Sequence, residues 1–209
     1  METIKINHRK TRKMAINQAK KVIADGGVVL YPTDTLYGLG ANIFDENALK
    51  KIYHLKKRST KKPISVCVSN IEYISKIAYI DSVVMAKISR LLPGPFTILL
   101  KKKKGISDLL TAGSDKIGIR IPDNEICQKI TEKFPITTSS ANISGEETKN
   151  SPSEIINQLG VGVDLILDSG PLKFNKSSTV IDFTLNPPLV MRKGAGLEEY
   201  EKNIKHINY

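Results

Sequence analysis

The chain has 209 residues, 40% of them hydrophobic and 25% charged, with a formal net charge of +11, which fits one large domain or two small ones around a real core. No run approaches the roughly 20 apolar residues of a membrane span, and the polar, basic residues 1–13 lack the apolar segment of a secretory signal. The two cysteines form no CxxC and the three histidines are scattered, which argues against a zinc site or a disulfide framework and predicts a reduced, cytoplasmic protein with no membrane partner.

The positive charge suggests an anionic partner such as a nucleotide or RNA. Of the 32 basic residues 26 are lysine, which commonly fills solvated surfaces, and six are arginine. Arg58, Arg120 and Arg192 stand in short motif-like contexts, and a guanidinium presents a fixed fork that suits carboxylate and phosphate. These three arginines are therefore better candidates for binding than the net charge itself.

Helical and strand patterns alternate along the chain. Apolar residues repeat at helical spacing over 10–25, Gly26-Gly27 ends that helix, and the apolar run 28–31 predicts a buried strand. Asp45 can cap a second helix that runs to Leu55. Further strands are predicted at 64–68, 96–100, 116–121, from 136, at 164–167, 179–183 and 189–191; further helices at 71–77, 81–92, 123–133, from 151 and from 197; and a loop at 105–115. The alternation is typical of an α/β fold, and no internal repeat or domain boundary is evident.

The stretch 28–40 ends its strand at Pro32 and continues with two threonines, an aspartate, a tyrosine and two glycines. Strand ends are common binding positions, so one interpretation is that this strand end forms a wall of a small-molecule site. The alternative is a strand followed by an ordinary polar turn.

Three other stretches carry candidate binding groups, each with a structural alternative. The basic run 56–63 is either a phosphate site or a solvated helix end that complements the helix dipole. Arg120, just before Pro122, is either an anion clamp or one half of a surface ion pair. The strand from 136 ends in four consecutive hydroxyl residues and Asn142, which suit phosphate and carboxylate oxygens, or form a Ser/Thr-rich turn.

Several common catalytic motifs are missing. The sequence contains no GxxxxGK[ST], no GxGxxG and no GxSxG, and the carboxylates form no glycosidase or metal-binding pattern. What is left is a set of strand ends that carry hydroxyls and arginines. Such a site would act by positioning and electrostatic stabilisation, without a protein nucleophile or catalytic side chain of its own.

Eight motifs occur in a fixed order: YPTDTLYGLG, the run from Lys56 to Pro63, PGPFTILL, IGIRIP, SSAN-x-SG, SPSE, STVID and VMRKG. Together they resemble the threonylcarbamoyl-AMP synthase family, the YrdC-like proteins, from about Gly26 to Gly196. The resemblance implies a twisted, mixed open sheet with surrounding helices and a deep basic cavity. It also implies a single YrdC-like domain over 1–209, with its core at about 10–196, a terminal helix or tail at 197–209 and none of the extra C-terminal domain of longer members.

The implied activity is condensation of L-threonine, bicarbonate and ATP to threonylcarbamoyl-AMP and pyrophosphate. A separate tRNA threonylcarbamoyl transferase would then use the product to modify a tRNA adenosine. Matched position by position, the implied threonine-binding residues are Thr35, Cys67, Arg120, Thr138 and Ser178. The implied ATP-binding residues are Lys56, Arg58, Lys62, Ser140, Asn142, Ser151 and Arg192. Mg²⁺ is expected to arrive with ATP, without direct protein ligands.

A second hypothesis is an RNA-binding module, or a paralogue without synthase activity, that kept a basic surface. The net charge and the run Lys101–Lys104 motivate it, with tRNA or double-stranded RNA as the partner. The alternative for this lysine run is a solvated strand end.

Overall fold

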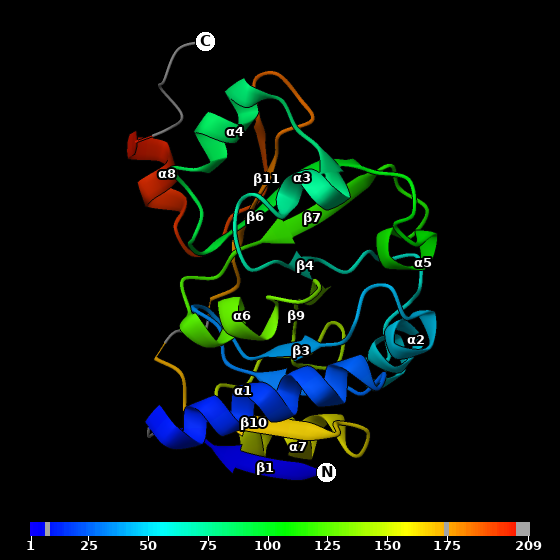
Figure 1. Cartoon of the computed structure of the whole chain (residues 1–209). Coiled ribbons are helices and arrows are strands. Elements are labelled where there is room, and N and C mark those ends of the chain that lie inside the picture. The colour runs from blue at the N-terminus through cyan, green and yellow to red at the C-terminus, as the bar shows by residue number, and fades with distance from the viewer. Residues whose placement is uncertain (7–8, 174–175, 204–209) are drawn as a thin grey trace.

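The computed structural model describes residues 1–6, 9–173 and 176–203. Its strands form two mixed sheets that lie one above the other in Figure 1. The first has the order β1 (Glu2–Lys5), β10 (Leu165–Asp168), β2 (Val29–Tyr31), β3 (Gly38–Gly40) and β9 (Ser139–Ser140). The second has the order β12 (Leu189–Arg192), β11 (Thr179–Asp182), β6 (Phe96–Lys102), β7 (Lys116–Arg120), β4 (Val66–Cys67) and β8 (Ile136–Thr137), with β5 (Ala78–Tyr79) paired to β6.

Both sheets contain parallel and antiparallel pairs, so the predicted mixed α/β class is confirmed. The strands are divided between two sheets where one open sheet was expected. The sheets meet at an isolated bridge between Asn42 and Ile136, next to a hydrogen bond of 2.8 Å from the Thr137 amide to the Ala41 carbonyl. This junction brings strand ends of both sheets close together.

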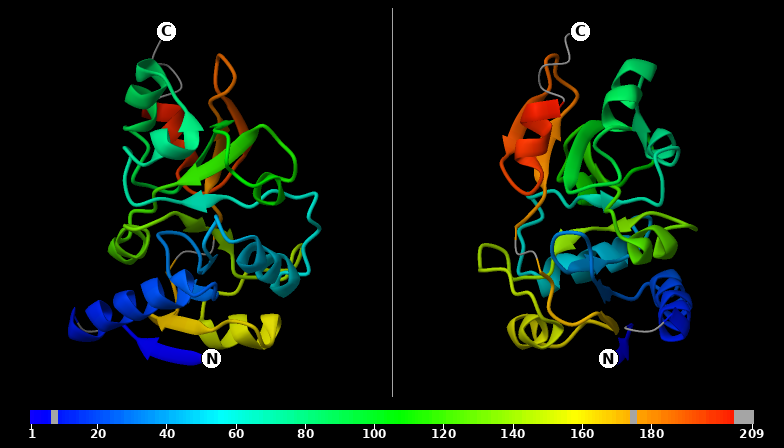
Figure 2. Two further views of the ribbon diagram at one scale, coloured as in Figure 1. Left: turned by 45° about the vertical axis from the view of Figure 1, so that its right-hand side comes forward. Right: turned by 90° about the vertical axis from the view of Figure 1, so that its left-hand side faces the viewer.

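Eight helices surround the sheets in the described part of the chain (Figure 2). They are α1 (Arg9–Ala24), α2 (Glu46–Leu55), α3 (Ile74–Ile77), α4 (Ser82–Ile88), α5 (Asp108–Thr111), α6 (Glu125–Ile130), α7 (Pro152–Leu159) and α8 (Leu197–Asn203). The predicted caps are confirmed: Asp45 accepts from the amides of Asn47 and Ala48 at 2.9 and 3.1 Å, and Ser151 caps α7 with Pro152 at its first turn. The terminal helix is present to Asn203, and the rest of the tail lies outside the described residues. No described helix is both long and apolar enough to cross a membrane.

The strand 29–31 is completely buried, as its composition predicts. The glycines that follow have a packing reason, because β3 runs directly over the ring of Tyr31. A Cβ added at Gly38 or Gly40 would lie 3.1 or 2.9 Å from ring atoms. The Tyr31 hydroxyl donates to the Thr137 carbonyl at 3.1 Å. These contacts fix the hydroxyl-rich loop between β2 and β3 at the junction of the two sheets.

Four short elements were not predicted: β1, β3, β5 and α5. β1 lies in the polar N-terminal stretch and pairs with β10, and the Glu2 amide donates to the Asp164 carbonyl at 2.9 Å. An edge strand of this kind owes its order to its partner, which local periodicity does not report. The helix α5, in the segment expected as a loop, is one turn capped by Ser107.

Candidate functional site

One cavity is lined by residues from both sheets and from the loops between them. Its lining residues are Thr33, Thr35, Leu36, Tyr37, Gly38, Lys56, Arg58, Pro63, Ile64, Ser65, Thr97, Arg120, Thr138, Ser139, Ser140, Ser177, Ser178 and Arg192. Four of these are cations, many carry hydroxyls, and none is a carboxylate. The strand end after β2 is therefore a wall of a cavity, as one of the two interpretations predicted.

Arg120 is held at the end of β7 by the loop that follows β2. Its Nη2 donates to Asp34 Oδ1 at 2.8 Å and to Thr35 Oγ1 at 3.0 Å. The Thr35 hydroxyl lies 3.1 Å from that of Thr33, which donates to the Leu36 carbonyl at 2.6 Å. Arg120 is thus a buried guanidinium whose position on the cavity wall is fixed by the Asp34 carboxylate and the Thr35 hydroxyl.

Arg192 approaches the cavity from the end of β12. Its Nε and Nη2 donate to the Ser178 carbonyl at 3.1 and 2.8 Å, and Nη2 also donates to Ser178 Oγ at 3.0 Å. The Ser178 hydroxyl lies 2.8 Å from that of Thr97 on β6. Burial, followed by the charges of Arg120 and Arg58, lowers the pKa of Arg192. The three guanidiniums therefore lie close enough to repel one another, which an anionic ligand would relieve.

Lys56 and Arg58 follow the end of α2. The Lys56 ammonium donates to the carbonyl of Ser140, to the Asn142 carbonyl at 2.7 Å and to Asn142 Oδ1 at 3.2 Å. Arg58 donates from Nη2 to the Pro63 carbonyl at 2.9 Å and from Nε to the Lys62 carbonyl at 3.3 Å. The basic run is thus tied on one side to the serine-rich turn and on the other to its own loop.

Burial, followed by the charge of Arg58, lowers the pKa of Lys56 to about 7. Three oxygen acceptors surround its three protons, so the ammonium form is well placed below that pH. The charge of the cavity therefore changes near neutrality.

We expect the affinity of the wild-type protein for ATP to fall as the pH rises from about 6 to 8.5, because Lys56 loses its positive charge through its pKa of about 7. Lys56→Met should bind ATP weakly with a flatter pH profile. Calorimetry with both proteins at each pH gives the difference between their ATP affinities. The protonation of ATP affects both proteins equally, so it cancels in this difference. Lys57→Met, at the neighbouring exposed lysine, is the matched control. An equal pH slope in the wild type and Lys56→Met would contradict the assignment.

Eight of the twelve predicted binding residues line this cavity: Thr35, Lys56, Arg58, Arg120, Thr138, Ser140, Ser178 and Arg192. Asn142 lies one layer behind, where its Oδ1 accepts from Lys56 and from Ser140 Oγ, the latter at 2.6 Å. Asn142 thus contacts two lining residues, and its contact with ATP stays a prediction.

Lys62, Cys67 and Ser151 are not brought to the cavity lining. Lys62 is exposed and supplies its carbonyl to Arg58 and Tyr53. Cys67 is completely buried in the core cluster that contains Tyr31 and Cys127. Ser151 uses its hydroxyl as the cap of α7, accepting from the Glu154 amide. None of these three side chains lines the cavity, and their ligand contacts stay predictions.

Other lining residues were not selected from the sequence: Thr33, Tyr37, Ser65, Thr97, Ser139 and Ser177. The sequence does mark Thr97, because it is the one hydroxyl residue in the apolar run 96–100. It also marks Ser177, which directly precedes the predicted threonine-binding residue Ser178. Ser65 offers no comparable signal, because single serines at strand starts are common.

The chemistry of the cavity lining suits polyanionic and carboxylate ligands. Four cations without a lining carboxylate attract anions, and the hydroxyls supply short hydrogen bonds. A bare Mg²⁺ finds no carboxylate ligand on this lining, so its fit here is as a complex with ATP phosphates. The enclosed space is about 110 Å³, so a nucleotide must extend outward past the partly exposed Arg58 or displace lining side chains.

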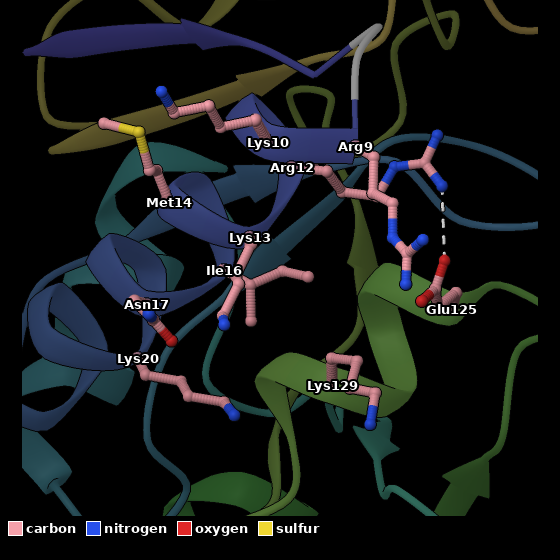
Figure 3. A pocket seen from close by; sticks show the side chains of 10 residues that line it. All are labelled: Arg9, Lys10, Arg12, Lys13, Met14, Ile16, Asn17, Lys20, Glu125 and Lys129. Carbon is pink, nitrogen blue, oxygen red and sulfur yellow. Dashed lines mark hydrogen bonds and ion pairs between the residues drawn. The ribbon is translucent and has the colours of Figure 1, made fainter.

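A larger hollow of about 1050 Å³ lies elsewhere, between α1 and α6 (Figure 3). It is an open groove lined by Arg9, Lys10, Arg12, Lys13, Met14, Ile16, Asn17, Lys20, Glu125 and Lys129. Arg12 pairs with Glu125 at 3.2 Å, and Lys20 and Lys129 both pair with Glu132. Volume alone does not make this groove the reactive site, because it lacks the convergent buried polar groups of the cavity.

The sequence of this chain is similar to a known protein family and to several known proteins. Residues 21–194 match the family model Sua5_yciO_yrdC, described as Telomere recombination. A Methanocaldococcus jannaschii protein, provisionally named threonylcarbamoyl-AMP synthase, is 42% identical over 88% of this chain and 87% of its own length. A Pyrococcus abyssi threonylcarbamoyl-AMP synthase is 36% identical over 98% of this chain, which spans 62% of that relative.

Two solved structures are similar throughout. Sua5 of P. abyssi in complex with L-threonine superposes with a TM-score of 0.87 at 34% identity, covering 97% of this chain and 60% of the other. The crystal structure of Escherichia coli YciO, a protein named as uncharacterized, superposes with a TM-score of 0.82 at 32% identity. The match covers 93% of this chain and 95% of YciO. The family model covers most of this chain, and the similarity extends to both groups of relatives. The chain therefore belongs to the Sua5/YciO/YrdC family.

Proposed function

We propose that this protein is an L-threonylcarbamoyladenylate synthase, a nucleotidyltransferase that uses L-threonine, bicarbonate and ATP. The observation that carries the proposal is the convergence of Arg120, Arg58, Arg192 and Lys56 on one hydroxyl-lined cavity without a lining carboxylate. The relatives named threonylcarbamoyl-AMP synthase and the threonine complex of P. abyssi Sua5 support it.

The proposed roles follow from charge and position. Arg120, with Thr35, Thr138 and Ser178 nearby on the lining, binds the threonine carboxylate and hydroxyl. Arg58 and Arg192 bind the phosphates, and Lys56, whose protons go to Ser140 and Asn142, adds its positive charge. Mg²⁺ is bound by the ATP phosphates and shares their charge.

The chemistry requires alignment more than a protein nucleophile. The threonine amine attacks the carbon of bicarbonate and water leaves, which gives a carbamate. A carbamate oxygen then attacks the α-phosphorus of ATP, the bond to the β-phosphate oxygen breaks, and pyrophosphate leaves. The cations offset the charge on the phosphates during this step. The product would be consumed by a tRNA threonylcarbamoyl transferase.

The test is to mix the protein with ATP, Mg²⁺, bicarbonate and L-threonine and to measure pyrophosphate. We expect pyrophosphate release that depends on both threonine and bicarbonate, with threonylcarbamoyl-AMP detected by mass spectrometry. Omission of threonine is the internal control. Release that is absent, or independent of threonine, would place the chain with a paralogue of another activity.

A second candidate function, binding of tRNA or double-stranded RNA, is favoured by the groove between α1 and α6. Helix α1 carries six cations and no acid. Its first turn contains Arg9, Lys10 and Arg12, at the end where the helix dipole disfavours cations. Arg9, Lys10 and Lys13 have no recorded ion-pair partner among the described residues. The run 101–104 is less free, because Lys102 pairs with Asp108 and Lys103 donates to the Ser75 carbonyl at 2.6 Å.

Charge reversal on each surface separates the two lysine clusters. We expect Lys10→Glu with Lys13→Glu to weaken binding of a folded tRNA transcript, and to reduce the salt slope by about 0.9 per lost phosphate contact. Lys101→Glu with Lys104→Glu, at two exposed lysines, is the matched control and should change little. The opposite order would assign RNA binding to the strand end, and no salt-dependent binding by the wild type would remove this candidate.

A further inference from the structure

The buried ion pair at the cavity suggests a role for a residue that does not line it. Arg120 uses only Nη2 in its recorded contacts, with Asp34 and Thr35. Its Nε is buried and has no hydrogen-bond partner among the described residues. A buried donor left without a partner carries a desolvation cost, so the ion pair with Asp34 is the main contact that holds this guanidinium in place.

Asp34 holds Arg120 without itself lining the cavity. Its Oδ1 accepts from the guanidinium at 2.8 Å, and its Oδ2 accepts from the Asp123 amide at 3.1 Å. The two side chains are only 8% and 10% exposed. The carboxylate thus links the loop after β2 to the turn after β7. The relative position of these two segments sets the direction of the Arg120 side chain.

Charge gives Asp34 a second effect. Three guanidiniums converge on the cavity, and the lining contains no carboxylate. Asp34 balances the charge of one of them and is not itself a lining residue. An ion pair with fixed geometry limits the guanidinium to one rotamer, so less freedom is lost when a substrate binds.

We propose that Asp34 is a positioning residue for the carboxylate of the amino-acid substrate: it orients Arg120 so that the remaining guanidinium donors face that carboxylate. This inference rests on the proposed function, in which Arg120 binds the threonine carboxylate. The competing interpretation is that Asp34 occupies Arg120 in the free protein and must be displaced by substrate. The two differ in sign, because displacement predicts tighter threonine binding once the Asp34 charge is removed.

The test compares Asp34→Asn with the wild type, using calorimetry with L-threonine, L-threoninol and ATP. L-Threoninol has the amine and hydroxyl of threonine but no carboxylate. We expect Asp34→Asn to weaken L-threonine binding about tenfold, with L-threoninol and ATP each changed by less than about twofold. Retained ATP binding also reports that the variant is folded. If Asp34→Asn does not fold, Asp34→Glu keeps the charge at a changed distance and should show the same selective loss in smaller degree.

Three outcomes would overturn the inference: unchanged or tighter threonine binding, an equal loss for threonine and threoninol, or an equal loss for ATP. Arg120→Ala is measured alongside. If Arg120→Ala leaves threonine binding intact, the site assignment of the proposed function fails, whatever Asp34→Asn does. Because these are binding measurements, an absence of synthase turnover would reject the proposed activity without deciding the role of Asp34.

Discussion

Arg120→Ala is expected to weaken L-threonine binding by about 100-fold while ATP affinity changes by less than about threefold. Hydrogen bonds to a charged group contribute about 1.5–3 kcal/mol each, and a carboxylate that loses its guanidinium loses more than one. The substitution also leaves Asp34 buried without its partner, so the substrate carboxylate would meet an uncompensated negative charge. Calorimetric titration with each ligand separately gives the two affinities.

The same substitution has a structural cost that must be measured. Removal of one partner of a buried ion pair costs about 3–5 kcal/mol in folding stability. Urea denaturation of Arg120→Ala should show this loss, and the double substitution with Asp34→Asn should recover part of it without recovering threonine binding. If the double variant binds threonine like the wild type, Arg120 is not the carboxylate clamp.

Arg58→Ala is expected to weaken ATP binding by about 10- to 100-fold, equivalent to about 1.4–2.8 kcal/mol, and to leave threonine affinity within about threefold. The guanidinium is held at the cavity by the carbonyls of Lys62 and Pro63, so its charge is pre-positioned for a phosphate. Burial removes part of the hydration of Arg58 and so lowers its pKa. A nonhydrolysable ATP analogue is the appropriate ligand for calorimetry.

Arg90→Ala, at an exposed arginine away from the cavity, is the matched control and should leave both affinities unchanged. An ATP affinity equal to that of the wild type in Arg58→Ala would move the phosphates to another part of the cavity. Opposite selectivity of Arg58→Ala and Arg120→Ala is the central expectation, since it requires two separate anion positions in one cavity.

Local patterns predicted the elements that depend on local physics. The apolar run 28–31 is a buried strand, and the caps at Asp45 and Ser151 begin helices, because side-chain oxygens satisfy free amides within the same turn. The edge strand β1 was missed because its order comes from pairing with β10, which lies more than 150 residues later in the chain. Short elements that depend on a distant partner leave little trace in the sequence.

The candidate site divides in the same way. The resemblance that the ordered motifs carry led to eight lining residues, of which the pattern of hydroxyls and arginines alone indicated only a part. Cys67 belongs to the core in this structure because its side chain packs with Tyr31 and Cys127, although its strand partner in register is Arg120. Which neighbour a side chain meets is decided by packing between elements, and a motif match does not include that information.

The sequence by itself determined the mixed α/β class, the capped helix starts at Asp45 and Ser151, the family and the types of group that bind anions. Only the tertiary structure decided that strand ends from two sheets meet at one cavity, that Lys56 is satisfied by the serine-rich turn, and that Asp34 holds Arg120 in place. The physical reason is that composition and periodicity are local, whereas a binding site consists of distances between residues far apart in the chain. Those distances are set by sheet pairing and core packing.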